Sequence, residues 1–146
     1  MAHIQQQILD AISAALVDLT DADGRVYVDS LDPKRAAKLP YILIAEAGEQ
    51  VDADTLSSDE RLFDVQITCA LKLTATHAAE SRAFGLAVEK LIAADEAGIG
   101  ALCGGGHFIT SSQLQQAGTA EEPYAARVQS WRFIYRCDPE DPEVAL

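Results

Sequence analysis

The residues between Leu62 and Thr74 alternate between apolar and polar side chains, and this pattern constrains the fold more than any other part of the chain. The even-numbered positions from Asp64 to Thr74 are polar, with Ala70 as the neutral exception, and the apolar odd-numbered positions are Phe63, Val65, Ile67, Cys69, Leu71 and Leu73. Successive side chains of a strand point to opposite faces, so the alternation predicts one long strand with a buried and a wet face. A sheet containing this strand is therefore not enclosed on both sides.

Two segments have the spacing of amphipathic helices. The first carries a large aliphatic residue at every fourth position, at Ile4, Ile8, Ile12 and Leu16, and Gly24 is a suitable break after it. The second runs from about His77 to Asp95, and its apolar stripe consists of Phe84, Ala87, Val88, Leu91 and Ile92. Both helices are expected to bury one side and expose the other.

The remaining strands are expected at Arg25–Val28, at Tyr41–Ala45, around Phe108–Thr110 and at Arg127–Cys137, where β-branched or aromatic residues concentrate. The predicted order is α-β-β-β-α-β-β. This order indicates an α+β fold with a mostly antiparallel four- to five-stranded sheet and two amphipathic helices packed on one face. The polar stretches Gly48–Arg61 and Gln115–Tyr124 are expected to be loops.

The chain has 146 residues, a length that suits one domain. Residues 1–137 are expected to form this single α+β domain. Residues 138–146 begin with the sequence Asp-Pro-Glu-Asp-Pro-Glu, and this acidic, proline-interrupted tail is expected to be flexible.

The net charge excludes several partners. There are 11 Lys and Arg against 23 Asp and Glu, which gives a formal charge of −12. Binding of nucleic acid or anionic lipid requires clustered positive charge, so we expect most of the protein surface to bind neither. No apolar run approaches the roughly 18 residues that a membrane span needs. Three widely spaced cysteines without a CxxC motif indicate reduced thiols in a cytoplasm.

Cys103 and His107, separated by three glycines, are the pair most suggestive of chemistry. They could be two zinc ligands, but a structural zinc site needs a full tetrahedral set and the sequence offers one loose pair. They could be a nucleophile and its base, but no nucleophile elbow accompanies them. The glycines also lack the spacing of a phosphate-binding loop. We therefore expect no catalytic residue, metal or cofactor; a small ligand-binding domain or enzyme that uses Cys103 and His107 is the alternative.

Charged residues outside this pair are candidates for protein contacts. The carboxylates between Gly48 and Arg61 lack EF-hand spacing, and a local basic cluster follows Pro33. Opposite charges on one chain suit association with another copy of it. The candidate interface residues are Lys34, Arg35, Lys38, Asp52, Asp54, Asp59, Glu60 and Arg61.

The order of these features resembles a known family. An N-terminal amphipathic helix leads to Gly24-Arg25-Val26-Tyr27, a basic connector and Leu39-Pro40-Tyr41-Ile42-Leu43-Ile44. An acidic stretch, the alternating strand Phe63–Thr74, a second helix and a final strand ending in Phe133-Ile134-Tyr135-Arg136 follow. This is similar to the tail terminator (tail completion, minor tail protein U-like) proteins of long-tailed bacteriophages, over roughly Ile4 to Cys137.

The resemblance implies a structural protein without catalytic activity. It implies a hexameric ring at the head-proximal end of the virion tail, assembled in the host bacterial cytoplasm. The ring would cap the tail tube, stop its polymerisation and join the head, so the implied partners are further copies, the tail tube protein and a head-completion or connector protein. DNA would pass through the lumen without specific binding, since acidic walls repel it. Another head–tail connector or completion protein is the close alternative.

Overall fold

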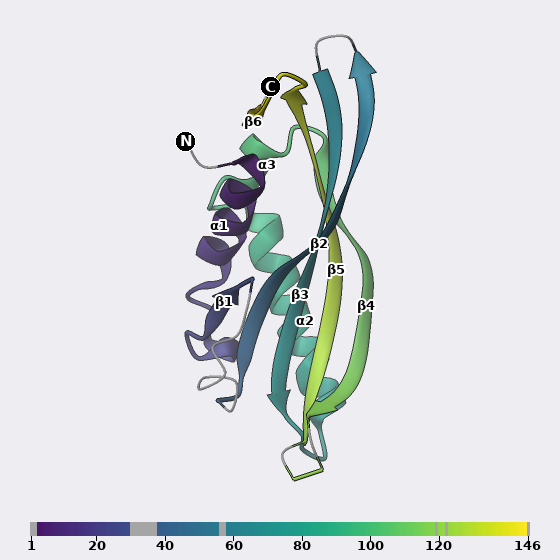
Figure 1. Ribbon diagram of the computed structural model, residues 1–146. Helices are drawn as coiled ribbons and strands as arrows, with labels where there is room; N and C mark the ends of the chain where they lie inside the picture. Colours follow the sequence, from purple (N-terminus) through teal and green to yellow (C-terminus); the bar gives the residue numbers. More distant parts are fainter. Residues whose placement is uncertain (1–2, 30–37, 56–57, 119, 122, 146) are drawn as a thin grey trace.

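Long antiparallel strands dominate the computed structural model, which describes residues 3–29, 38–55, 58–118, 120–121 and 123–145 (Figure 1). The strands are β1 (Val26–Val28), β2 (Tyr41–Thr55), β3 (Ser58–Lys72), β4 (Gly106–Gly118), β5 (Pro123–Asp138) and β6 (Asp141–Ala145). The helices are α1 (Ile4–Leu16), α2 (His77–Ala94) and the short α3 (Ile99–Leu102), with one 3-10 turn at Thr20–Ala22. The predicted long alternating strand is confirmed as β3.

The sheet has the order β1-β2-β3-β5-β4, and β6 pairs with β5 off this path. Only β1 runs parallel to its neighbour, β2; the other described pairings are antiparallel. These observations confirm the predicted α+β class and its mostly antiparallel sheet.

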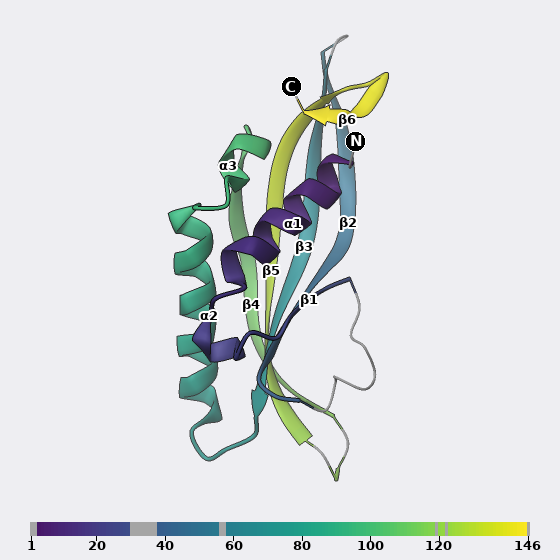
Figure 2. The ribbon, with the colours of Figure 1, turned by 90° about the vertical axis from the view of Figure 1, so that its left-hand side faces the viewer.

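Both long helices lie on one face of the sheet, which we call the inner face (Figure 2). The odd-numbered residues of β3 point toward them, and Phe63, Val65, Ile67 and Cys69 are all fully buried. They pack with the aliphatic stripe of α1, including Ile4, Ile8, Ile12 and Leu16, and with Phe84, Val88 and Ile92 of α2. The even-numbered residues of β3 point to the outer face, where Gln66 and Lys72 are exposed.

A glycine allows α2 to lie close to β5. A Cβ atom at Gly85 would lie 2.8 Å from Nε2 of Gln129, which donates a hydrogen bond to the Gly85 carbonyl oxygen. The Oε1 of Gln129 accepts from the indole of Trp131. Gln129 is almost completely buried, so these bonds satisfy a polar side chain inside the core.

The predicted loop at Gly48–Arg61 is wrong, because these residues form the outer half of the β2–β3 hairpin. Backbone pairing continues from Tyr41 opposite Ala70 up to Thr55 opposite Ser58. A bulge between Glu46 and Gly48 interrupts it, and Gly48 has a φ of 147°, which favours glycine. The sequence did not indicate this strand, because most of its described side chains are exposed or form ion pairs and therefore lack the apolar alternation of a strand packed on a core.

The structure differs from two further expectations about secondary structure. The predicted loop Gln115–Tyr124 contains the end of β4 and the start of β5, which pair as far as Gly118 opposite Pro123. The tail expected to be flexible contains β6, in which Ala145 lies opposite Cys137 of β5. Backbone hydrogen bonds to an existing strand do not require apolar side chains, so polar composition alone did not exclude these strands.

Candidate functional site

The part of the hairpin beyond the bulge carries most of the predicted interface residues. We call residues 49–55 and 58–62 the hairpin end; Figure 1 shows that it extends past the helices. Within it, Asp52 lies opposite Glu60, and Arg61 lies opposite Val51. Asp59 lies opposite Ala53, and the backbone of Asp54 lies on the same strand, β2. The structure thus brings Asp52, Asp59, Glu60 and Arg61 together.

Arg61 is the centre of a polar network on the inner face of the hairpin end. Its guanidinium nitrogens lie 3.4 Å from Glu49 and 3.6 Å from Asp59, and the side chains of all three residues are 17% exposed. Glu49 also accepts hydrogen bonds of 2.6 Å from the Tyr135 hydroxyl and from the side-chain amide of Gln5. The network therefore ties the hairpin end to β5 and to the start of α1.

Burial and the hydrogen bond to Glu49 raise the pKa of Tyr135 above its ordinary value, so its hydroxyl remains a donor at neutral pH. The Nε of Arg61 is buried and has no hydrogen-bond partner within the described structure. The sequence did not reveal this network because Glu49 is 44 residues from Gln5 and 86 residues from Tyr135. The register of β2, β3 and β5 brings Glu49 to Tyr135, and the packing of α1 on the sheet brings Gln5 to Glu49.

The outer face carries a second ion pair that the sequence did not indicate. Arg132 of β5 lies opposite Asp64 of β3 and contacts both carboxylate oxygens, at 2.8 and 3.2 Å. Near the hairpin end, Arg136 lies 3.8 Å from Glu60, which offsets the repulsion between Glu60 and Asp52. The outer face is therefore polar and charged while it remains open to solvent.

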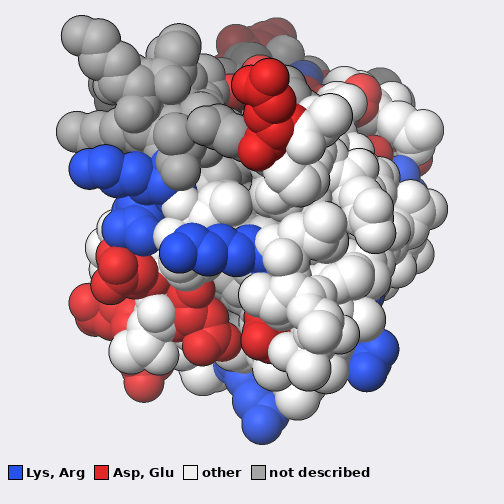
Figure 3. Space-filling view, turned by 90° about the horizontal axis from the view of Figure 1, so that it is seen from below, with Lys and Arg blue, Asp and Glu red and all other residues white. Residues whose placement is uncertain are grey.

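Lys38 lies at the other end of the molecule, just before β2 begins, while Lys34 and Arg35 lie outside the described residues. Lys38 and Arg25 line one shallow hollow together with Tyr27. Figure 3 views this end and shows basic side chains beside acidic ones, next to a broad uncharged surface. Strand β2 separates the two ends: from Tyr41 to Asp52 it runs for eleven residue steps, roughly 36 Å. Among the described residues, Lys38 therefore does not share a patch with Asp52, Asp59 and Glu60.

An aromatic cluster lies on the outer face of the sheet, at the end opposite the hairpin end. Tyr41 is 3% exposed, and its ring lies 6.1 Å from that of Tyr27 and 6.5 Å from that of Tyr124. Burial and a hydrogen bond with Tyr124 raise the pKa of Tyr41 above its ordinary value. The cluster joins β1, β2 and β5, so it stabilises the end of the sheet opposite the hairpin end.

Cys103 is buried and His107 is half-buried. Cys103 is 2% exposed, and burial together with the nearby Asp95 raises the pKa of its thiol to about 12. Such a thiol stays protonated at neutral pH, which disfavours a nucleophilic role. The ring of His107 stacks on Phe133 with 5.7 Å between ring centres. Its Nδ1 is buried and has no partner in the described structure.

Residues 3–29, 38–55, 58–118, 120–121 and 123–145 contain no cluster of three or more His, Cys, Asp or Glu arranged to hold a metal ion. Among these residues, no helix combines the length and the apolar character needed to cross a membrane.

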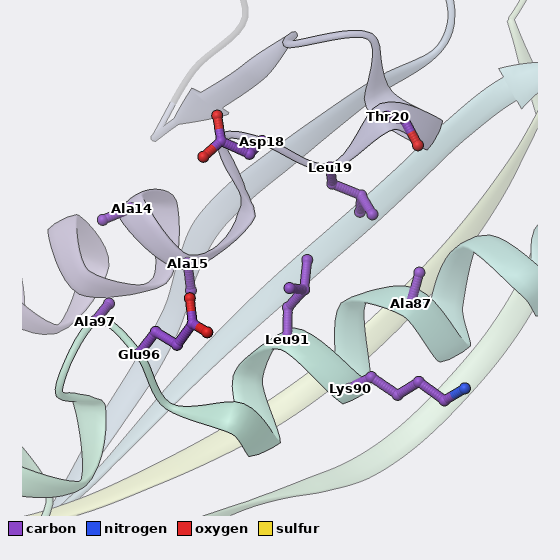
Figure 4. Close-up of a pocket in the computed structure, with 10 residues that line it drawn as sticks. All are labelled: Ala14, Ala15, Asp18, Leu19, Thr20, Ala87, Lys90, Leu91, Glu96 and Ala97. Carbon is purple, nitrogen blue, oxygen red and sulfur yellow. The ribbon is translucent and has the colours of Figure 1, made fainter.

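A groove of about 610 Å³ lies between the end of α1 and α2 (Figure 4). Leu19 and Leu91 point toward one another across it, and four alanines line it. Charged side chains also line it, namely Asp18, Lys90 and Glu96. The groove offers apolar surface but no converging set of polar groups of the kind that fixes a small ligand.

Comparisons with known proteins find matches among solved structures only. No protein-family model matches the chain, and no curated protein matches it. Among solved structures, the chain is similar to a chain in the "Virion of native gene transfer agent (GTA) particle". The two are 16% identical with a TM-score of 0.41, and the match covers 90% of this chain and 92% of that chain. A likeness this distant does not establish a shared function.

Proposed function

We propose that this chain is a structural virion protein, a tail terminator that caps the phage tail tube as a ring. The ring would stop tube polymerisation and offer the surface on which the head joins the tail. The proposal starts from the resemblance in element order, and one structural observation carries it further. The hairpin end projects beyond the helical layer and presents charged residues on both of its faces.

Such a projection suits contacts between proteins better than it suits chemistry. Its side chains belong to rigid paired strands, tied down by the network of Glu49, Arg61 and Tyr135. A rigid charged surface can meet a complementary partner with little loss of conformational freedom. We infer that the hairpin end contacts the tail tube protein or the next subunit of the ring.

The proposed role requires no active site. The buried, protonated Cys103 thiol fits a core position better than a catalytic one. We therefore propose that the protein is not an enzyme and that its partners are further copies of itself, the tube protein and a head-completion or connector protein. An acidic lumen would let DNA pass without adhering to the wall.

Electron microscopy of the chain mixed with polymerising tail tube protein tests this function. We expect ring-shaped density at tube ends and shorter tubes as the chain is added. Tubes that grow to the same length, with bare ends at all ratios, would contradict the proposal.

A pair of charge-matched variants tests the surface. Asp52→Lys/Glu60→Lys reverses two charges on the hairpin end, while Asp10→Lys/Glu89→Lys makes the same change in net charge on the helices. We expect the first variant to lose tube capping and the second to keep it. Equal activity of the two would show that the hairpin end is not the contact surface.

A further inference from the structure

Strand β4 forms one edge of the sheet and is unusually open to solvent. It runs for thirteen residues and pairs with β5 on one side; the described residues place no strand on its other side. Every side chain from Thr110 to Gln116 is exposed, so this stretch is uncovered on both faces as well as along its free edge. An edge of this length presents a row of unpaired backbone donors and acceptors to any other strand.

The composition of β4 does not protect this edge. Natural edge strands are usually blunted by charged side chains or proline. From Gly106 to Gly118 the chain has no Asp, Glu, Lys, Arg or Pro, although 23% of the whole chain is charged. The one irregularity is a register shift between Ile109 and Ser111. An unprotected edge in an otherwise highly charged protein indicates a strand that is paired in the working assembly.

The opposite side of the sheet offers a second free edge. Strand β1 covers β2 only from Ile42 to Ile44, so the described residues place no strand beside β2 beyond that point. This edge is acidic, with exposed side chains at Glu46 and Asp52. Two such edges would repel each other in a symmetric β2–β2 pair, whereas the uncharged β4 meets no such repulsion.

We propose that β4 of one subunit pairs with the free edge of β2 in the next copy of the chain, so that the sheets join head to tail. The proposal rests on the proposed ring for its symmetry, because a contact between two different edges closes only as a ring or continues as a filament. Strand direction fits: β2 and β4 are antiparallel within one subunit, and rotation about an axis along the strands keeps them antiparallel between subunits.

The register follows from which side chains share a face. Gln50, Ser111 and Gln113 all lie on the outer face, opposite Leu62, Ser130 and Val128 respectively. Placing Ser111 opposite the neighbour's Gln50 shifts each subunit by about 13 Å along the strands, and placing Gln113 there shifts it by about 20 Å. The sheet that one subunit adds, measured across its strands, is about 19 Å wide. The corresponding strand tilts, about 35° and about 45°, are those of closed sheets.

A charge swap at one position tests the pairing, with assembly followed by analytical ultracentrifugation and native mass spectrometry. Gln113→Lys places a cation near the acidic β2 edge, and Gln113→Glu places an anion there. We expect Lys to lower the concentration at which half the chains assemble, and Glu to raise it, each by about two- to fivefold per contact. The same pair of changes at Gln66, which is exposed in the middle of the sheet, is the control and should leave assembly unchanged.

Disulfide trapping identifies the partner strand. The native thiols are all buried, so Gln50→Cys and Gln113→Cys each introduce an accessible cysteine, and Ser111→Cys samples the second register. We expect mixed oxidation of the Gln50→Cys chain with either β4 variant to give a heterodimer. A product from the Gln113→Cys chain alone, with weaker assembly of both the Lys and the Glu variants, would instead show β4–β4 pairing and overturn the proposal.

The remaining outcomes separate this inference from the proposed function. Rings that cap tubes normally, but whose assembly responds to neither charge at residue 113, would overturn the strand pairing and leave the terminator function standing. A chain that forms no mixed disulfide and neither assembles nor binds tubes would overturn both.

Discussion

The two halves of the β2–β3 hairpin follow the same alternation of faces but carry different chemistry. In the half covered by the helices, residues 41–45 and 63–72, the inner positions are apolar and Val65, Ile67 and Cys69 are fully buried. In the hairpin end, the inner positions of β3 are Asp59 and Arg61, and Val51 opposite Arg61 is 50% exposed. Strand geometry fixes which face a side chain takes, whereas the layer packed on that face decides which side chain is stable there.

Truncating inner residues of the two halves should give the largest difference. Ile67→Ala leaves a cavity under the helices, so we expect it to lower the free energy of unfolding by about 2–5 kcal/mol. Val51→Ala shortens a half-exposed side chain on the same face, so we expect a change within about 0.5 kcal/mol. Urea unfolding followed by circular dichroism measures both. Similar losses would mean that the hairpin end is buried as deeply as the core.

Breaking the polar network should give the next largest effect. Glu49→Ala removes the acceptor of Tyr135 and Gln5 and leaves the largely buried Arg61 without its closest carboxylate. We expect a loss of about 2–4 kcal/mol in the free energy of unfolding. The exposed Glu46 on the same strand is the control, and Glu46→Gln should change stability by less than about 0.5 kcal/mol.

A double variant distinguishes the effect of an unpaired buried charge from the effect of lost packing. If Glu49→Met lowers the free energy of unfolding because it leaves Arg61 unpaired, then Glu49→Met/Arg61→Met should restore much of that free energy. Additive losses in the double variant would contradict this interpretation.

Two buried thiols, Cys69 of the covered half and Cys103 after α3, should make stability depend on pH in the alkaline range. Burial raises the pKa of Cys69 and of Cys103 from 9.0 to about 12. The unfolded chain therefore releases these protons before the folded chain does, so the free energy of unfolding should fall as the pH rises from about 9 to about 12. The raised pKa values of Tyr41 and Tyr135 act in the same direction at higher pH.

Urea unfolding at several pH values between about 8 and 11 measures this dependence. The variant Cys69→Ala/Cys103→Ala should show a shallower fall than the unaltered chain. An equal slope in both would show that the buried thiols do not contribute.

The sequence predicted the covered half because burial leaves a periodic signal. Ile4, Ile8 and Ile12 mark the face of α1, and the odd-numbered residues of β3 mark the face that α1 covers. The hairpin end leaves no such signal: Asp52, Asp59 and Glu60 are typical of a loop until the register shows them paired. The interface residues of the hairpin end were predicted from their charge and remain a prediction, whereas the contact of Glu49 with Tyr135 depends on long-range pairing that no local pattern encodes.

We propose that the covered half is the stable core and that the hairpin end and the two free sheet edges are the assembly surfaces. Hydrogen–deuterium exchange of the free chain and of the chain bound to tail tubes tests it most directly. We expect new protection within residues 46–55 and within β4, with no change in β3 between Val65 and Cys69, which is protected in both states. New protection confined to the solvent faces of α1 and α2, with β4 exchanging equally in both states, would contradict it.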